Sequence, residues 1–313
     1  METTLDVRGV TRRYGTREVL KGITFAAQKG EIIALLGRNG TGKSTLMNTI
    51  TGYLCQSGGD ISICGYDVLI QPLEARRRTG YLPEQPPLYP DMTVTEYLRY
   101  CCRLRGLKAS TQTAEIARVI ELTGLEAYAH RPSGRLSKGY RQRLGVAQPP
   151  LLILDEPGSG LDPLQMAQMR EVIRRAGQDS TVLLSSHLLS EVTNVCGRAI
   201  VLDEGVIRYD GTMDALLRGA ASLRLMYRGD APMMALIREL PGVTEVTEQD
   251  CREDGCHLLL IRHEMDADLR AQVSALCYEN HCALLEETNG SDALEDAFLH
   301  VIARKDISRK EVE

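Results

Sequence analysis

The stretch GRNGTGKST, at residues 37–45, has residue types and a spacing that suit the binding of phosphate groups. It matches the pattern G-x-x-x-x-G-K-[ST], in which glycines let backbone N–H groups turn inward around phosphates. A short apolar run precedes it and a helical pattern follows, so the positive end of a helix dipole should add to the attraction. A plain glycine-rich turn before a helix is the alternative, but the strand, the glycines, the Lys-Ser pair and the helix together favour a phosphate loop.

Every residue of this loop is a candidate nucleotide-binding residue. Lys43 can reach the β and γ phosphates of a nucleotide, and the Ser44 hydroxyl can be a ligand of Mg²⁺. The full candidate set is Gly37, Arg38, Asn39, Gly40, Thr41, Gly42, Lys43, Ser44 and Thr45.

The segment LLILDEP, at residues 151–157, ends an apolar run with two acidic residues. Ligands of α/β sheets bind at the carboxyl ends of the strands, which is where Asp155 and Glu156 should lie. Asp155 would hold Mg²⁺, directly or through water, and Glu156 would polarise an attacking water molecule. Two ordinary solvated acids at a strand end are the alternative, and the phosphate loop upstream favours phosphoryl chemistry.

Short apolar runs without polar alternation are typical of strands that are buried on both faces of a largely parallel sheet. Four such runs occur, at residues 31–37, 151–156, 181–186 and 198–205, with helical patterns between them at 43–51, 164–175 and 188–195. Strands that alternate with helices predict an α/β core. Two strands around Gly15 precede this core, and residues 93–124 read as a mostly helical insertion.

A different pattern begins near residue 220, where strand and helix patterns follow in βαββαβ order and predict a small α+β domain of ferredoxin-like type. We therefore expect two domains, residues 1–219 and 220–313, with a helical subdomain at about residues 90–148 of the first. The net charge of the whole chain is −5, and the second part carries 10 Lys/Arg against 19 Asp/Glu. An acidic tail argues against nucleic-acid binding there, and we expect no nucleic-acid partner.

The segment LSKGYRQR, at residues 136–143, resembles the LSGGQ signature of ATP-binding cassette (ABC) ATPases, the motor subunits of ABC transporters. Lys138 and Tyr140 stand where Gly and Gln are common, and both variants look like the subgroup that works with ABC-2 type exporters. The order of phosphate loop, signature, carboxylate pair and histidine also resembles the family. The resemblance extends from residue 1 to about 220, and the tail is similar to the accessory domain of that subgroup. It implies a P-loop ABC nucleotide-binding domain.

The resemblance implies roles for further residues around ATP and Mg²⁺. Tyr14 matches the aromatic residue that stacks on adenine, and His187 matches a histidine that contacts the γ-phosphate and assists the catalytic Glu156. Asp162 lies in a segment that matches the D-loop, across the interface between two subunits.

Residues of the signature are implied to serve the ATP of a second subunit. Ser137 should cap the following helix, and Gly139 lets the backbone approach a phosphate closely. Together with Lys138, these residues would complete a site whose other half is the phosphate loop of the partner.

The family's Q-loop glutamine aligns with Glu84, and Gln85 follows it, so either residue could approach Mg²⁺ and the attacking water. The proline-rich loop after them lies where the family couples to its membrane subunit. The implied partners are a second ABC ATPase chain, as a homodimer, and an ABC-2 type membrane permease. No apolar run reaches the ~18 residues of a membrane span, so we expect a cytoplasmic protein held at the inner face of the cell membrane by the permease.

The nine cysteines read as reduced thiols, because paired short spacings are missing. Two C-x4-C pairs, Cys251/Cys256 and Cys277/Cys282, lie beside His257 and His281 in the tail. A zinc site is one interpretation, but zinc knuckles usually have C-x2-C spacing, and scattered thiols are the better interpretation.

The join between the signature helix and the strand at 151–156 is shorter than in the family, because Pro149 follows Gln148 directly. Either the helix is naturally trimmed or a segment is missing, and a Gln148–Pro149 Cα separation well beyond 3.80 Å would refute the trimmed helix. The leading function is ATP hydrolysis coupled to export. The alternatives are a soluble ABC-type ATPase that acts on ribosomes or DNA, and a nucleotide-dependent regulator whose hydrolysis is impaired.

Overall fold

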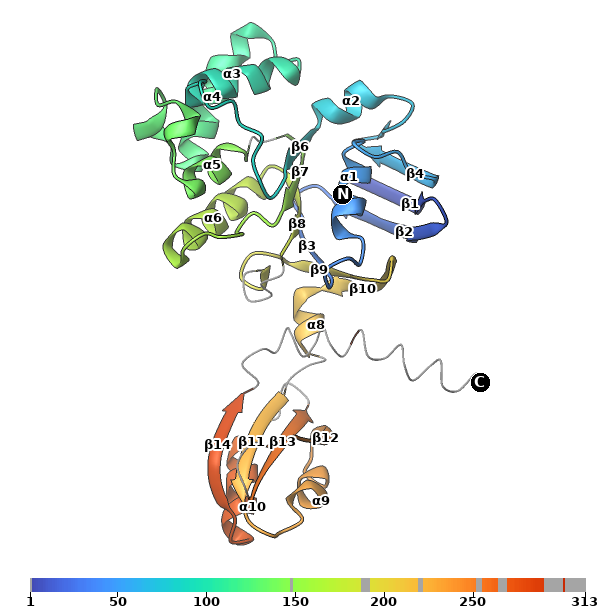
Figure 1. Cartoon of the computed structure of the whole chain (residues 1–313), viewed down its shortest axis with the longest axis vertical. Helices are drawn as coiled ribbons and strands as arrows, with labels where there is room; N and C mark the ends of the chain where they lie inside the picture. Colours follow the sequence, from blue (N-terminus) through green and yellow to red (C-terminus); the bar gives the residue numbers. More distant parts are fainter. Residues whose placement is uncertain are drawn as a thin grey trace. The chain divides into compact units, whose positions relative to one another are not determined.

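The computed structural model describes residues 2–146, 149–186, 192–218, 222–251, 255–263, 269–289 and 301. The chain divides into two compact units, Met1–Gly211 and Thr212–Glu313, and the helix α8 (Met213–Arg218) therefore falls in the second unit (Figure 1). In these described ranges, every helix is too short or too polar to cross a membrane.

A six-stranded sheet forms the centre of the first unit, with the strand order β10-β9-β3-β8-β7-β6 (Figure 1). The pairs β6–β7, β7–β8, β8–β3 and β3–β9 are all parallel. The side chains of the inner strands are almost wholly buried, which explains their continuous apolar runs. The strands are β3 (Ile32–Leu36), β6 (Thr79–Leu82), β7 (Leu151–Asp155), β8 (Thr181–Ser185), β9 (Arg198–Asp203) and β10 (Val206–Thr212).

A second, antiparallel sheet has the order β2-β1-β4-β5. Its strands are β1 (Thr3–Tyr14), β2 (Arg17–Gln28), β4 (Gly58–Ile63) and β5 (Tyr66–Asp67). One hydrophobic core joins this sheet, the helix α1 (Lys43–Ile50) and the six-stranded sheet. Because α1 begins at Lys43, this core fixes the end of the phosphate loop.

Helices gather on the other side of the six-stranded sheet (Figure 1). The helix α3 begins with a capping box, in which Thr93 and Glu96 exchange hydrogen bonds. A separate small core lies among α3, α4 and α5, and α4 and α5 pack against α6. The elements on this side are α3 (Val94–Leu104), α4 (Ala109–Thr123), η1 (Glu126–Tyr128), η2 (Ser133–Arg135), α5 (Lys138–Leu144) and α6 (Pro163–Ala176). The helix α2 (Pro72–Arg77) instead contacts β5 and β6 and contributes Ala75 to the core of the antiparallel sheet (Figure 1).

The second unit contains an antiparallel sheet of order β12-β13-β11-β14, with α9 and α10 packed on one face. Numbered along the unit, these strands run 2-3-1-4, which is the arrangement of a ferredoxin-like fold and agrees with the predicted βαββαβ order. The elements are β11 (Ser222–Arg228), α9 (Met233–Arg238), β12 (Val243–Gln249), β13 (Cys256–His263), α10 (Arg270–Glu279) and β14 (Ala283–Asn289).

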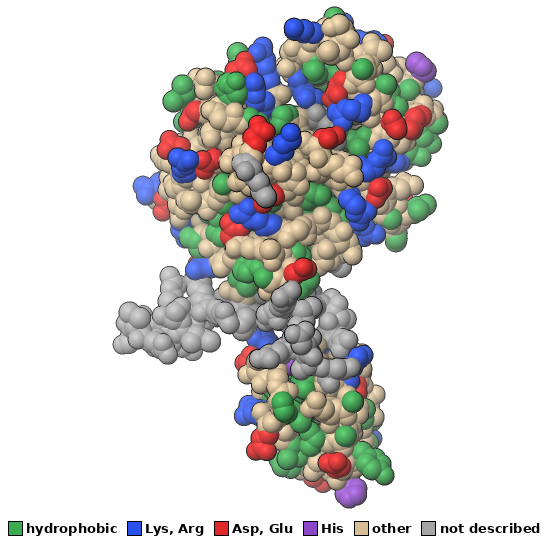
Figure 2. Space-filling view, turned by 180° about the vertical axis from the view of Figure 1, so that it is seen from behind, with side chains coloured by type: hydrophobic (Ala, Val, Ile, Leu, Met, Phe, Trp, Pro, Cys, Tyr) green, Lys and Arg blue, Asp and Glu red, His purple; other side chains and the backbone are tan. Residues whose placement is uncertain are grey.

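Charged side chains are mixed over the face of the first unit that Figure 2 shows, where Lys and Arg alternate with Asp and Glu. A surface of this kind supports solubility without a strong field of one sign.

Candidate functional site

The loops with candidate functional residues leave the same edge of the six-stranded sheet. Four parallel neighbours, β6, β7, β8 and β3, end at this edge, as the carboxyl ends of parallel strands must. The register places Leu35, Ser185 and Asp155 side by side near the carboxyl ends of β3, β8 and β7. The phosphate loop, the carboxylate pair and the loop of Glu84 therefore start from adjacent positions, although they are far apart in sequence.

The phosphate loop connects β3 with α1 and depends on its glycines. Gly40 and Gly42 have φ angles of 79° and 110°, which favour glycine. Gly37 has no room for a side chain, because a Cβ atom there would lie 2.5 Å from the Leu202 carbonyl oxygen and 2.6 Å from Thr41 Oγ1. The local fold therefore accounts for the spacing of the glycines without any reference to a ligand.

Lys43 is the charged residue that the loop encloses, and only 8% of it is exposed. Its Nζ atom donates hydrogen bonds to the carbonyl oxygens of Gly37, at 2.6 Å, and Arg38, at 3.1 Å. Burial lowers the pKa of Lys43, and the negative charges of Glu156 and Asp155 partly oppose this shift. The ammonium group thus lies within electrostatic reach of both carboxylates.

A buried serine links the two carboxylate residues. The Ser185 hydroxyl donates to Asp155 Oδ1 at 2.7 Å and accepts the Glu156 backbone N–H at 3.0 Å. Ser185 is fully buried. Glu156 has a φ of 50°, a left-handed conformation that is unfavourable for a residue with a side chain. The bond to Ser185 thus holds a strained residue at the end of β7.

The signature segment leads into α5, and its Ser137 and Lys138 are exposed. Ser137 caps the helix, as predicted, and its Oγ accepts the Tyr140 N–H at 3.4 Å. Gly139 is buried, and a Cβ atom there would come within 3.0 Å of the Gln165 side chain. A larger residue at this position would therefore press on the Gln165 side chain at the start of α6.

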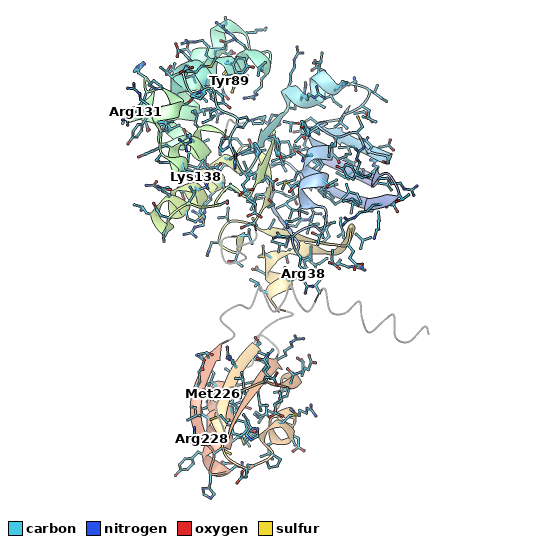
Figure 3. All side chains as sticks on the ribbon, in the orientation of Figure 1. Arg38, Tyr89, Arg131, Lys138, Met226 and Arg228 are labelled. Atoms are coloured by element: carbon cyan, nitrogen blue, oxygen red, sulfur yellow. The ribbon has the colours of Figure 1, made fainter. Side chains whose placement is uncertain are left out.

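Lys138 lies over the loop that follows the carboxylate pair, as a side chain at Gly160 would meet its Nζ atom at 2.5 Å (Figure 3). The same loop ends at Asp162, whose carboxylate caps α6 by accepting the Gln165 N–H at 2.8 Å. The signature segment and the D-loop segment of one chain are thus in direct contact.

Glu84 links its own loop to the loop of Ser159 and to the helix α5. Its carboxylate Oε1 accepts a hydrogen bond from Ser159 Oγ at 3.1 Å, and its backbone carbonyl accepts one from Gln142 Nε2 at 2.8 Å. Gln142 lies on α5 and is fully buried. Among the described residues, its Oε1 atom finds no hydrogen-bond partner. Both Q-loop candidates, Glu84 and Gln85, are exposed, and these contacts belong to Glu84.

Tyr14 lies at the end of β1 and 46% of it is exposed. The Arg12 guanidinium lies 4.7 Å from the centroid of its ring. A cavity of about 330 Å³ adjoins the first half of the phosphate loop, and its lining does not include Tyr14. The lining residues are Arg17, Glu18, Val19, Lys21, Arg38, Asn39, Gly40, Thr41, Glu204 and Gly205.

Two predictions concern residues outside the described ranges, namely the role of His187 and the geometry of the join at Gln148. On the strand side of that join, the Pro149 carbonyl accepts Ser180 Oγ at 2.7 Å and the Pro150 carbonyl accepts the Thr181 N–H at 2.8 Å.

Oxygen donors dominate the predicted metal position. Ser44 is exposed at the start of α1, and Asp155 ends β7 at the same edge of the sheet. Hydroxyl and carboxylate oxygens are the ligands that Mg²⁺ prefers, so this donor set fits the ion.

Sequence reasoning missed Ser185, and it placed Gln142 and Ser159 only within the signature and D-loop segments, without their contacts to Glu84. A signal for Ser185 was present, because Ser185 ends an apolar strand. If that strand is a parallel neighbour of β7, its last residue lies beside Asp155. The contacts of Gln142 and Ser159 to Glu84 join residues far apart in the chain, and no local pattern indicates them.

Comparisons with known proteins give a consistent result. A family model described as "ABC transporter" matches residues 20–159. The Nod factor export ATP-binding protein I of Burkholderia orbicola is 34% identical over 78% of this chain and 82% of its own length. The linearmycin resistance ATP-binding protein LnrL of Bacillus subtilis is 30% identical over 96% of this chain and 98% of its own. A solved structure titled as the ATP binding subunit of an ABC transporter is similar, with a TM-score of 0.63 and 32% identity over 69% of this chain and 92% of its own.

Proposed function

Since this chain belongs to the ATP-binding subunits of ABC transporters, we propose that it hydrolyses Mg-ATP at the described sheet edge and thereby drives export through a separate membrane subunit. The observation that carries the proposal is the convergence of Lys43, Asp155 and Glu156. These residues come from two separate loops, and the pKa of Lys43 responds to both carboxylates. A buried cation beside two acids at a phosphate loop is suited to phosphoryl transfer.

Each residue has a distinct part in the proposed reaction. The backbone N–H groups of the phosphate loop bind the phosphates, and Lys43 exchanges its two carbonyl acceptors for the β and γ phosphates. Ser44 and Asp155 would hold Mg²⁺, which neutralises charge on the phosphates. Glu156 orients the attacking water and accepts its proton, and Ser185 fixes the position of Glu156.

The complete site requires a second copy of the chain in this proposal. Ser137, Lys138 and Asp162 are exposed and belong to segments that resemble motifs at the interface between two subunits. In a head-to-tail homodimer, the signature of one copy would cover the ATP bound to the phosphate loop of the other. ATP binding would then close the dimer, and hydrolysis would release it.

Export is proposed from the names of the relatives, which include proteins of Nod factor export and linearmycin resistance. The partner would be a membrane permease of the ABC-2 type that holds the chain at the inner face of the membrane. The loop after Glu84 is the proposed contact, and it presents Tyr89 at the helical side of the first unit (Figure 3). The Tyr89 ring is 48% exposed and meets Tyr100 edge-on at 5.4 Å between centroids.

The variant Glu156→Gln tests the function. It keeps the shape of the side chain but removes the base, so we expect ATP to stay bound, turnover to fall by more than about 100-fold, and ATP to convert monomers into a stable dimer. Steady-state ATPase assays and size-exclusion chromatography with and without Mg-ATP measure these effects. Unchanged turnover would remove Glu156 as the base, and failure to bind ATP at all would overturn the proposal.

A further inference from the structure

The two C-x4-C pairs of the second unit lie on different faces of its sheet. Cys277 and Cys282 belong to the core that faces α9 and α10, together with Leu225 and Tyr227. Cys256 pairs with Arg228 across β13 and β11, and Arg228 follows Tyr227 directly. Because successive side chains of a strand point to opposite faces, Cys256 lies on the face away from the helices. The four cysteines therefore do not form one zinc centre.

Three sulfur-containing side chains, those of Met226, Cys251 and Cys256, lie on this second face. Met226 pairs with Leu258, two residues from the pair of Arg228 and Cys256, so Met226 and Cys256 share the face. The last residue pair between β12 and β13 is Gln249 with Leu258. Cys251 lies two residues after Gln249, and Cys256 lies two residues before Leu258. The Cys251 thiol contacts Met226 Sδ at 4.0 Å, which places Cys251 on the same face.

We propose that Cys251, Cys256 and Met226 bind one soft monovalent cation, Cu(I). Thiolate and thioether sulfurs are the ligands that select Cu(I). With metal–sulfur bonds of about 2.3 Å, two ligands of a trigonal metal lie about 4.0 Å apart. The observed separation of Cys251 Sγ and Met226 Sδ therefore matches a shared metal without any movement of the two side chains.

The charges around the proposed site also agree with this metal. Binding releases one proton from each thiol, so two thiolates and one monovalent cation leave a complex of net charge −1. Arg228 offsets this charge, because its Nη2 atom lies 3.4 Å from Cys256 Sγ. Figure 3 shows Met226 and Arg228 along the sheet of the second unit.

Zinc is less suited to this position. Zinc sites usually have four nitrogen, sulfur or oxygen ligands, and the described residues contain no group of three or more His, Cys, Asp and Glu that could hold a metal. His257 is directed to the other face, where it stacks on Tyr227 at 5.1 Å and its Nδ1 meets Glu248 at 2.9 Å.

The pair Cys277/Cys282 provides a matched control with the same spacing. Burial, and then the neighbouring Cys282, raise the pKa of the Cys277 thiol to about 11. Removal of its proton therefore costs more than for an ordinary thiol, and metal binding needs the thiolate.

A competition titration tests the proposal. The full-length, reduced protein is titrated anaerobically with Cu(I) against the chromophoric chelator bicinchoninate, and one tightly bound equivalent is expected. Changing Cys251 and Cys256 to Ser should weaken that equivalent by more than about 100-fold, and Met226→Leu by about 10-fold. The double change of Cys277 and Cys282 to Ser should leave it in place, and circular dichroism confirms that each variant is folded.

Opposite results would overturn the site. These are an unchanged tight equivalent in the folded Cys251/Cys256 variant, or its loss from the folded Cys277/Cys282 variant alone. Displacement of the bound Cu(I) by equimolar Zn²⁺ would also contradict the proposed selectivity. The titration does not involve ATP, so its failure leaves the proposed ATPase function unaffected.

Discussion

Replacement of Ser185 by Ala is the sharpest test of how Glu156, the proposed catalytic carboxylate, is held. Ser185 is fully buried, and its hydroxyl joins Asp155 Oδ1 to the backbone N–H of Glu156. The variant removes one oxygen atom and leaves the candidate ligands and base in place. We expect it to lower the rate of hydrolysis, because Glu156 in its left-handed conformation loses the acceptor that holds it.

The size of the effect follows from the two hydrogen bonds. The bond to the ionised Asp155 is short, and hydrogen bonds to charged groups contribute about 1.5–3 kcal/mol. If this contribution is lost from the transition state of ATP hydrolysis, kcat falls by roughly 10- to 150-fold. The affinity for Mg-ATP should change by less than about threefold, because the phosphate loop is untouched.

Steady-state ATPase assays over a range of Mg-ATP concentrations separate kcat from KM, and a fluorescent nucleotide analogue measures binding. Ser185→Thr keeps a hydroxyl and should restore most of the rate. Ser180→Ala is the matched control, since Ser180 is also buried and donates one hydrogen bond, to the Pro149 carbonyl, just ahead of the amino end of β8. It should lower stability without a comparable loss of kcat. A folded Ser185→Ala protein with kcat within about twofold of the parent would refute the reasoning.

Three further predictions concern the same sheet edge. Gln142→Leu removes the donor to the Glu84 carbonyl together with an Oε1 atom that is buried and has no partner among the described residues. Thermal stability should therefore change little, while kcat should fall about fivefold, which corresponds to about 1 kcal/mol. A kcat equal to that of the parent would contradict this prediction. Glu84→Ala removes the acceptor of Ser159 and should lower kcat about fivefold, whereas Gln85→Ala should leave it within about twofold; the reverse order in ATPase assays would assign the role to Gln85. The pKa of Lys43 is lowered by burial, so the free protein releases this proton below pH 10.5, and phosphate binding must restore it. ATP affinity should therefore weaken as pH rises through the lowered pKa, with proton uptake that calorimetry in two buffers measures; affinity independent of pH in this window would show that Lys43 is not a phosphate ligand.

The sequence predicted the sheet because its inner strands are buried on both faces and therefore appear as uninterrupted apolar runs. The phosphate loop was equally visible, because Gly37, Gly40 and Gly42 are required by backbone geometry that the chain adopts locally. The position of Ser185 beside Asp155 was not visible, because it depends on which strands are neighbours and in which register. The left-handed φ of Glu156 has no signature in the residue type, since tertiary contacts impose it.

The arrangement around Glu84 explains how distant parts of the molecule can respond to one nucleotide. The loop of Glu84 leads to the proposed contact with the membrane subunit, Gln142 lies on the signature helix, and Ser159 lies between Glu156 and Asp162. Lys138 makes a second link, because it packs on Gly160 of the same loop. A shift of Glu156 on ATP binding would therefore change the support of Glu84 and of the signature together. Because the signature is proposed to face the ATP of a second copy, this contact within one chain would give a physical route that couples the two ATP sites and the proposed membrane partner.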